Sequence, residues 1–317
     1  MENKKFDVIV VGELNVDLIL NQIESFPEIS KEKIAQKMDL TLGSSSAIFA
    51  SNISTLGLKV AFLGKIGKDN FGDFIIDELK KKNVDTNFII RDDNSKTGIT
   101  IVLNFDEDRA MVTYTGAMAE LTFKELNGDV ISYAKHLHFS SFYLQKGLKP
   151  NVSDLFALAK EKGLTTSFDM QWDPEEKWDM NYKEILPNVD IFFPNEMELL
   201  LLTGEKDINK GLEKLAKYGN SIVVKMGNKG SVSWDKKKIT HVKPFLNKNV
   251  VDSIGAGDSF NAGYIFKYLQ GAGTIESQKF ANLIGAINTT AAGGTGAFTC
   301  YENIMEIAKV KFGFSET

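Results

Sequence analysis

Short apolar segments alternate with amphipathic segments along most of the chain. Residues 6–11 are mostly apolar and stop at Gly12, which is typical of a buried strand. Residues 70–82 instead carry apolar side chains at helical spacing. Strand patterns also cover 59–63, 136–139, 165–168, 190–193 and 221–225, and helix patterns cover 152–162 and 210–218. This alternation predicts parallel β-α-β units in a layered α/β fold.

Two stretches, 17–42 and 97–115, break this alternation because their strand patterns have no helix between them. Within the second stretch, two apolar runs flank an acidic turn and predict a β-hairpin. The two stretches therefore predict a small β-sheet beside the α/β core. No segment rich in Pro, Gly or Ser sets them apart. We therefore expect one domain over residues 1–317 with insertions at about 14–42 and 97–116.

Charge and cysteine content narrow the class of protein. The chain has 37 Lys and Arg against 42 Asp and Glu, and it has no basic stripe, so we expect no nucleic-acid partner. The single cysteine, Cys300, excludes an internal disulfide and favours a reducing, cytoplasmic compartment. The richest apolar stretch, 189–202, is interrupted by Pro194, Glu196 and Glu198, so we also expect no membrane partner.

The segment 250–263 carries the most specific chemistry. A strand-like entry leads into Gly255, Ala256 and Gly257, and a helix pattern follows. Residues with so little side chain let backbone N–H groups approach a ligand, and a helix N-terminus favours an anion. Asp258 places a carboxylate beside this anion site, where it suits a base that accepts a proton from an attacking hydroxyl. Taken alone, Asp258 also fits a simple helix cap.

The segment 252–263 closely resembles the C-terminal motif of the ribokinase-like (PfkB-type) carbohydrate kinases. Further motifs follow the family's order at 12–17, 43–57, 64–72, 195–198, 225–230 and 282–297. The resemblance implies a three-layer αβα sandwich with a mostly parallel central sheet and a small β-sheet lid. It also implies phosphorylation of a sugar hydroxyl, with ATP as donor and Mg²⁺ as cofactor.

By this resemblance, Asp258 is the general base, and Gly255, Ala256 and Gly257 form the anion hole for the transferred phosphoryl group. Asn195 and Glu198 match the family's Asn-x-x-Glu motif. Glu198 would act on Mg²⁺ through its water shell, and Asn195 would face the phosphates. The alternative for this pair is an ordinary acidic helix start.

The nucleotide is expected at a glycine-containing loop. Lys225, Gly227 and Gly230 match the family's loop against the ribose and base. Asn282 stands where the family often has a residue near the adenine, although a plain packed helix is the alternative there. Asp252 resembles the family's monovalent-cation ligand, which implies a K⁺ site.

The sugar half departs from the family pattern. Asn15 and Asp17 match a sugar-hydroxyl contact, and Gly43 begins the family's Gly-Gly motif. Ser44 replaces the second glycine, and Ile48 stands where the sugar-binding Asn usually lies. The loss of one hydrogen-bonding contact argues against ribose, although Ser44 and the serines after it could supply hydroxyl donors.

A second sugar segment also differs from the family. Asp169 and Gln171 match an Asp-x-Asn stretch, with Gln171 in place of Asn. Asp173 lies roughly where several acid-sugar kinases carry an Arg. A carboxylate there disfavours an anionic sugar unless Arg109 of the lid compensates.

These departures favour a small neutral sugar, a hexose or ketose such as fructose. The alternatives within the class are a purine nucleoside kinase, with Ile48, Phe49 and Trp172 as apolar walls, and an acid-sugar kinase of the ketodeoxygluconate type. A protein of another class, a sugar-binding regulator without turnover, is also an open alternative. A nicotinamide-dependent oxidoreductase is disfavoured, because residues 12–17 lack the second glycine of a dinucleotide-binding motif. The family also implies a homodimer paired through the β lid.

Overall fold

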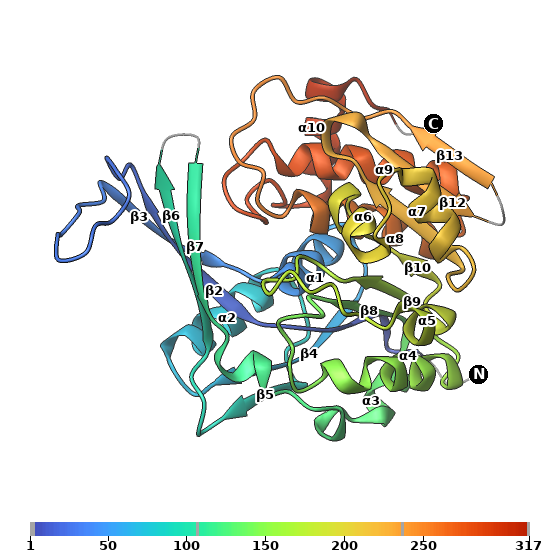
Figure 1. Cartoon of the computed structure of the whole chain (residues 1–317), viewed down its shortest axis with the longest axis horizontal. Coiled ribbons are helices and arrows are strands. Elements are labelled where there is room, and N and C mark those ends of the chain that lie inside the picture. The colour runs from blue at the N-terminus through green and yellow to red at the C-terminus, as the bar shows by residue number, and fades with distance from the viewer. Residues whose placement is uncertain (1–3, 106–107, 236–237, 316–317) are drawn as a thin grey trace.

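The computed structural model describes residues 4–105, 108–235 and 238–315 (Figure 1). Its main sheet has nine strands. Their order across the sheet is β13 (Lys238–Val242), β12 (Ser231–Asp235), β11 (Ser221–Lys225), β10 (Ile191–Phe192), β9 (Thr165–Asp169), β8 (Ala134–Ser140), β1 (Phe6–Val11), β4 (Val60–Gly67) and β5 (Ile89–Asp92). Pairing is parallel from β11 to β5, and only the two pairs β11–β12 and β12–β13 are antiparallel.

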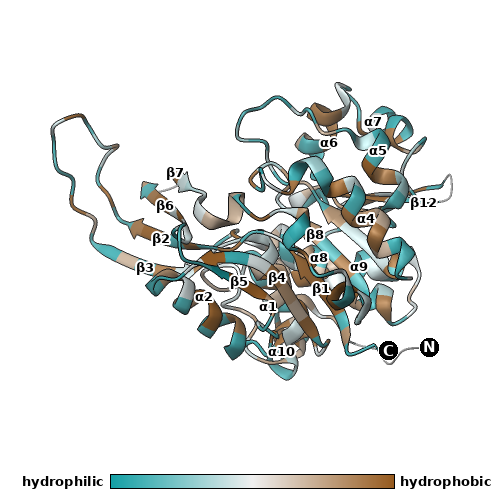
Figure 2. Ribbon diagram, turned by 90° about the horizontal axis from the view of Figure 1, so that it is seen from below, coloured by the Kyte–Doolittle hydropathy of each residue, from teal (hydrophilic) through white to brown (hydrophobic). Residues whose placement is uncertain are grey.

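Helices cover both faces of this sheet. One face packs against α1 (Ser45–Thr55), α2 (Asn70–Lys81), α8 (Ala256–Leu269), α9 (Thr274–Asn288) and α10 (Tyr301–Phe312). The other face packs against α3 (Gly128–Ser132), α4 (Val152–Glu161), α5 (Tyr182–Ile185), α6 (Glu196–Thr203) and α7 (Ile208–Leu215). The hydropathy colouring of Figure 2 shows the apolar strands β1 and β4 between these layers. The predicted three-layer fold with a mostly parallel sheet is confirmed.

Two separate cores follow from strand alternation. Ile9 and Val11 point into the core on the α4 side, and Val8 and Val10 point into the core on the α8 side. All four are completely buried, because β1 lies between two other strands and is covered on both faces.

The helices in the described part of the chain are too short or too polar to span a membrane.

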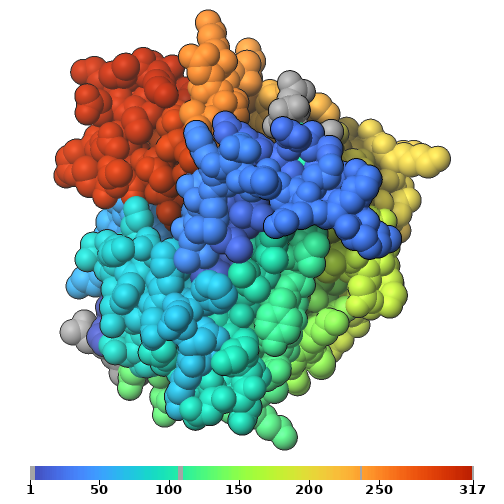
Figure 3. Space-filling view, turned by 90° about the vertical axis from the view of Figure 1, so that its left-hand side faces the viewer, coloured from blue at the N-terminus to red at the C-terminus, as the bar shows by residue number. Residues whose placement is uncertain are grey.

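A second, smaller sheet projects from the core, and Figure 3 looks onto it. Its strand order is β3 (Lys37–Leu42), β2 (Asn15–Asn21), β6 (Gly98–Phe105) and β7 (Asp108–Tyr114). β6 and β7 form the predicted hairpin. β2 also runs parallel to β6, so it joins two stretches that lie more than seventy residues apart in the sequence.

Candidate active site

The candidate site lies where the parallel strands end and helix α8 begins. Asp169 is the last residue of β9, and Lys225 is the last residue of β11. Asn195 follows β10 and forms a parallel β-bridge with Lys225. In open α/β sheets, ligands bind outside the carboxyl ends of such strands. The fold therefore gathers residues that are widely separated in the sequence.

Helix α8 begins with the glycine turn. Gly255 is its N-cap and has a left-handed φ of 75°. A Cβ atom added there would lie 2.7 Å from the Gly294 Cα atom, so only glycine fits without a backbone shift. Ile48 packs against the same turn, with its Cγ2 atom 3.0 Å from that Cβ position. Ala256 and Gly257 form the first turn, whose N–H groups have no partner within the helix.

Asp258 lies in the first turn of α8 and is only 8% exposed. Gln171 Nε2 donates a hydrogen bond to its Oδ1 atom at 3.0 Å, and the Ser45 hydroxyl donates another. Burial, with the negative charge of Asp169 adding to it, raises the pKa of Asp258 to about 7. A carboxylate with a pKa near neutrality suits a general base.

Asp169 and Lys225 form a buried ion pair beside Asp258. Asp169 is completely buried, and it also accepts a hydrogen bond of 2.5 Å from Asn261 Nδ2. Its other oxygen accepts the Gln171 N–H at 3.3 Å. Asp169 therefore organises the residues around the base, whereas the sequence had placed it only in the sugar subsite.

Asn195 and Glu198 open helix α6 with reciprocal hydrogen bonds. The Asn195 side chain accepts from the Glu198 N–H, and Glu198 Oε2 accepts from the Asn195 N–H, both at 2.8 Å. The helix-start alternative is therefore realised. Glu198 is 3% exposed, and burial together with the charge of Asp169 raises its pKa to about 7.

A divalent cation near Glu198 would stabilise the ionised form of this buried carboxylate. Carboxylate oxygens are the ligands that Mg²⁺ prefers, and Mg²⁺ usually keeps several waters. In the part of the chain that the structure describes, no three His, Cys, Asp or Glu side chains are grouped to hold a metal directly. The donor set therefore fits Mg²⁺ held through water.

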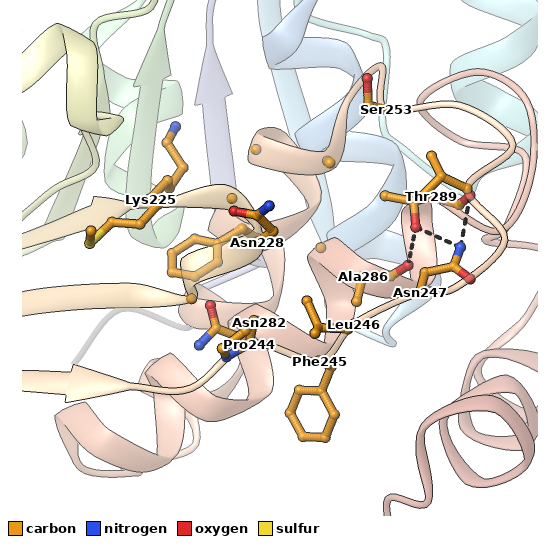
Figure 4. A pocket seen from close by; sticks show the side chains of 18 residues that line it. Lys225, Asn228, Pro244, Phe245, Leu246, Asn247, Ser253, Asn282, Ala286 and Thr289 are labelled. Carbon is orange, nitrogen blue, oxygen red and sulfur yellow. Dashed lines mark hydrogen bonds between the residues drawn. The ribbon is translucent and has the colours of Figure 1, made fainter.

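A cavity of about 320 Å³ lies next to the glycine turn (Figure 4). It has a mostly apolar end, which includes Pro244, Phe245 and Leu246. Asn282 lines this cavity, but its amide also donates to the backbone oxygens of Val242 and Lys243, at 3.3 and 3.1 Å. The residue thus fixes the loop that forms one wall of the cavity.

The predicted nucleotide loop borders the same cavity. Gly227 and Gly230 have left-handed φ angles of 54° and 91°. A Cβ atom on Gly230 would lie 2.2 Å from the Val242 backbone oxygen, so this turn depends on glycine. Lys225 also lines the cavity, but its ammonium group reaches Asp169.

Asp252 fixes the segment before the glycine turn. Its Oδ1 accepts from the Ile254 N–H and its Oδ2 from the Gly293 N–H, both at 2.9 Å. The side chain thus ties the segment before the glycine turn to the loop that contains Gly293.

A polar subsite lies between the small sheet and the core. Asn15 Nδ2 donates to Asp17 Oδ1 at 3.0 Å and to Thr100 Oγ1 at 3.1 Å. A Cβ atom on Gly43 would lie 2.4 Å from Asp17 Oδ1, so glycine allows this close approach. Burial raises the pKa of Asp17 to about 6. The subsite presents acceptors and donors suited to hydroxyl groups.

Glu13 supports this subsite and was not predicted from the sequence. It is 1% exposed, and its carboxylate accepts the Ser46 N–H at 3.2 Å and the Ser46 hydroxyl. Ser44 caps helix α1 and donates to the Glu13 backbone oxygen at 2.6 Å. Two of the three serines thus bind Glu13, and Ser45 binds Asp258. The sequence signal for Glu13 is a carboxylate two residues after the end of a buried strand.

Asp173 is bound by the backbone of its own loop. Its carboxylate accepts the N–H groups of Glu175, Lys177 and Trp178 at 3.0, 2.9 and 2.8 Å, and the residue is 3% exposed. The carboxylate therefore holds its own loop together, and its effect on an anionic sugar stays a prediction. Arg109 belongs to β7, but its side chain lies outside the described residues.

Comparison with known proteins agrees with this geometry. The pfkB family carbohydrate kinase model matches residues 5–299. An uncharacterized sugar kinase of Archaeoglobus fulgidus is 31% identical over 74% of this chain and 92% of that protein. A 5-dehydro-2-deoxygluconokinase of Clostridium perfringens is 26% identical over 98% of this chain and 93% of that protein. The structure of Arabidopsis thaliana ribokinase with ribose and ATP has a TM-score of 0.84 at 22% identity, covering 98% and 99% of the two chains.

The chain is therefore a carbohydrate kinase in class, a phosphotransferase with an alcohol group as acceptor. It belongs to the pfkB family. Its fold is that of the ribokinase-like proteins.

Proposed function

We propose that the protein transfers the γ-phosphoryl group of ATP to a hydroxyl group of a small neutral sugar. One observation carries the proposal: Asp258 and the glycine turn lie between a polar subsite and a cavity with an apolar end. The polar subsite suits the sugar, and the cavity suits the nucleotide, with Gly227, Gly230 and Asn282 at the ribose and base. Asp258 then faces the junction at which transfer takes place.

The residues of the chain have distinct tasks in this reaction. The sugar hydroxyl loses its proton to Asp258 as its oxygen attacks the γ-phosphorus. Gly255, Ala256 and Gly257 offer backbone N–H groups to the phosphoryl oxygens. Mg²⁺, when bound, would neutralise phosphate charge, and Glu198 would hold it through water, with Asn195 beside the phosphates.

The small sheet would act as a lid over the sugar. We propose that residues 14–42 and 97–116 are insertions in a single domain over 1–317, and that they exclude water during transfer. Asn15, Asp17 and Gly43 would contact the sugar hydroxyls. Ser44 and Ile48 would support this contact from α1.

Electrostatics support a neutral substrate. The carboxyl groups of Asp17, Glu13 and Asp258 surround the polar subsite, and burial raises the pKa of each. An added carboxylate would suffer repulsion from any of them that is ionised. An acid sugar is the second candidate, because the Clostridium perfringens relative is named for a gluconate substrate.

A substrate panel tests the proposal. We expect ADP release with Mg²⁺ and ATP to be fastest on a neutral hexose or ketose, among aldoses, ketoses, sugar acids and nucleosides. Addition of K⁺ would raise the rate if Asp252 serves a monovalent-cation site. Fastest turnover of a sugar acid or a purine nucleoside would contradict the neutral assignment. No turnover of any compound by protein that binds ATP would favour a sugar-binding regulator.

We also propose a homodimer that forms through the small sheet. The register places Leu18, Leu40, Ile101 and Val112 in one row on the face opposite Asp17, and Leu40 at one end of the row also packs against the α8-side core. Val112 is 66% exposed and Ile101 36% exposed. A contiguous apolar sheet face of this kind marks an interaction surface, and a second copy offers the same face.

Charge on this face should disrupt the dimer. We expect Val112→Lys to shift the protein from dimer to monomer in light scattering after size exclusion, because a lysine would be buried without a partner. Val310→Lys is the matched control, since Val310 is 75% exposed on α10, away from this sheet. A wild-type monomer, or a dimer that survives the Val112 substitution, would refute the interface.

We propose a cytoplasmic location as well. The single cysteine, Cys300, is free and exposed, which suits a reducing compartment.

A further inference from the structure

Lys225 is placed at the phosphoryl-transfer end of the cavity rather than at its base-binding end. A Cβ atom added to Gly257 would lie 3.6 Å from Lys225 Nζ. Figure 4 shows the Lys225 side chain extending toward the first turn of α8, whereas Asn282 and Phe245 lie at the other end of the pocket. The ammonium group is therefore next to the anion hole.

The Lys225 ammonium supplies the positive charge of this cavity. Among the described residues that line it, Lys225 is the only one with a charged side chain. Its side chain is 12% exposed, and the carboxylates of Asp169, Glu198 and Asp258 outweigh burial and raise its pKa. The lysine thus stays protonated beside the turn where several phosphate charges would gather.

Asp169 fixes the direction of this side chain. Its carboxylate binds Lys225 and Asn261 through Oδ2, and the Gln171 N–H through Oδ1. Gln171 in turn donates to Asp258 at 3.0 Å. The buried Asp169 carboxylate therefore fixes the positions of both the Lys225 ammonium and Gln171, and Gln171 orients the base. Asp169 is thus a positioning residue.

We infer that the Lys225 ammonium contacts an equatorial oxygen of the γ-phosphoryl group of ATP and stabilises the negative charge on that group during transfer. The inference rests on the proposed ATP-dependent function. In the step, the sugar oxygen bonds to the γ-phosphorus and the bond to the β,γ-bridging oxygen breaks. The electron pair of that bond stays on ADP, and the hydroxyl proton goes to Asp258. Lys225 forms no covalent bond and keeps its protons.

The decisive test compares ATP with ADP. We expect Lys225→Met to weaken ATP binding at least about tenfold in calorimetry without sugar, with ADP affinity changed less than about twofold. We expect kcat to fall about 100-fold or more, with little change in the KM for sugar. Lys225→Arg should recover part of the loss. Equal weakening of ATP and ADP, or an unchanged kcat, would overturn the inference.

Two further variants separate this role from a structural one. Lys225→Met leaves Asp169 buried without its cation, so the double variant Lys225→Met/Asp169→Asn removes both charges together. It should show the same selective loss of ATP affinity, and recovery of normal ATP affinity in it would overturn the inference. Lys65→Met is the matched control, because Lys65 is 9% exposed and pairs with Asp92 and Glu125 at 2.9 Å, away from this cavity. We expect Lys65→Met to lower the free energy of unfolding and to leave the preference for ATP over ADP unchanged.

The binding test also separates this inference from the proposed function. Wild-type protein that phosphorylates no sugar, yet prefers ATP to ADP through Lys225, would uphold the γ-phosphoryl contact and refute the kinase proposal. Sugar phosphorylation by the Lys225→Met variant at the wild-type kcat would uphold the kinase proposal and refute the γ-phosphoryl contact.

Discussion

Asp258→Asn should reduce kcat by about 10³- to 10⁴-fold, toward the upper end of what a general base contributes. The amide keeps the shape of the side chain and can still bind Gln171 or Ser45, but it cannot take the hydroxyl proton. We expect sugar and ATP binding to be retained in calorimetry. For the wild type, kcat should fall as the pH drops below about 7, because the base is then protonated.

The same substitution should raise stability at alkaline pH. The folded-state pKa of Asp258, about 7, lies above the ordinary value of 3.8, so the folded protein binds this proton more tightly than the unfolded chain. The ionised side chain therefore costs stability, in an amount that grows from about pH 4 to 7 and then stays constant. We expect Asp258→Asn to unfold with a free energy about 2–4 kcal/mol larger at pH 8, and with no gain near pH 4.

Denaturant unfolding at several pH values, together with initial rates, measures both effects. Asp207→Asn is a suitable control, since Asp207 caps helix α7 away from the site and Asn caps equally well. Its kcat should be unchanged. An Asp258→Asn protein that retains more than about a tenth of the wild-type kcat would rule out Asp258 as the base.

Gly255→Ala should lower kcat about 10²- to 10³-fold, the loss typical of a damaged oxyanion-type site. Its φ of 75° is unfavourable for alanine, and the added methyl group would meet the Gly294 backbone and Ile48. Either adjustment turns the N–H groups of Ala256 and Gly257 away from the phosphoryl group. We also expect unfolding to become easier by about 1–3 kcal/mol.

The control for this variant is Gly271→Ala. Gly271 follows helix α8 with a φ of 84°, and an added Cβ would have nothing within 4 Å. This variant should carry the backbone strain alone and keep its kcat. Rates measured well below each midpoint of thermal unfolding separate activity from stability. Equal kcat values for the two variants would show that the glycine turn is not part of the phosphoryl site.

The local sequence was sufficient to predict the parts of the site that are formed by neighbouring residues. Gly255, Ala256, Gly257 and Asp258 lie within four consecutive positions, so their turn-then-helix geometry follows from their own backbone preferences. Apolar periodicity likewise predicted most strands of the main sheet and its layered arrangement. Both signals are local, and the structure contains the predicted turn before α8 and the predicted strands.

Contacts across the sequence could not be predicted in this way. Asp169 and Lys225 are 56 residues apart, and Gln171 and Asp258 are 87 apart. Their pairing depends on which strands become neighbours and on how far each side chain reaches. Asp173 shows the same limit, because the sequence pattern does not reveal that three N–H groups of its own loop bind its carboxylate.

The sequence by itself therefore determined the class of chemistry: a layered α/β protein with a glycine turn and a carboxylate at a helix start. Only the tertiary structure decided the electrostatics of the site. It buried Asp258 beside Asp169 and so raised the pKa of the base to about 7, and it brought Lys225 to the anion hole. Burial and charge proximity are properties of the packed chain, since both depend on which distant residues exclude water from a given carboxylate.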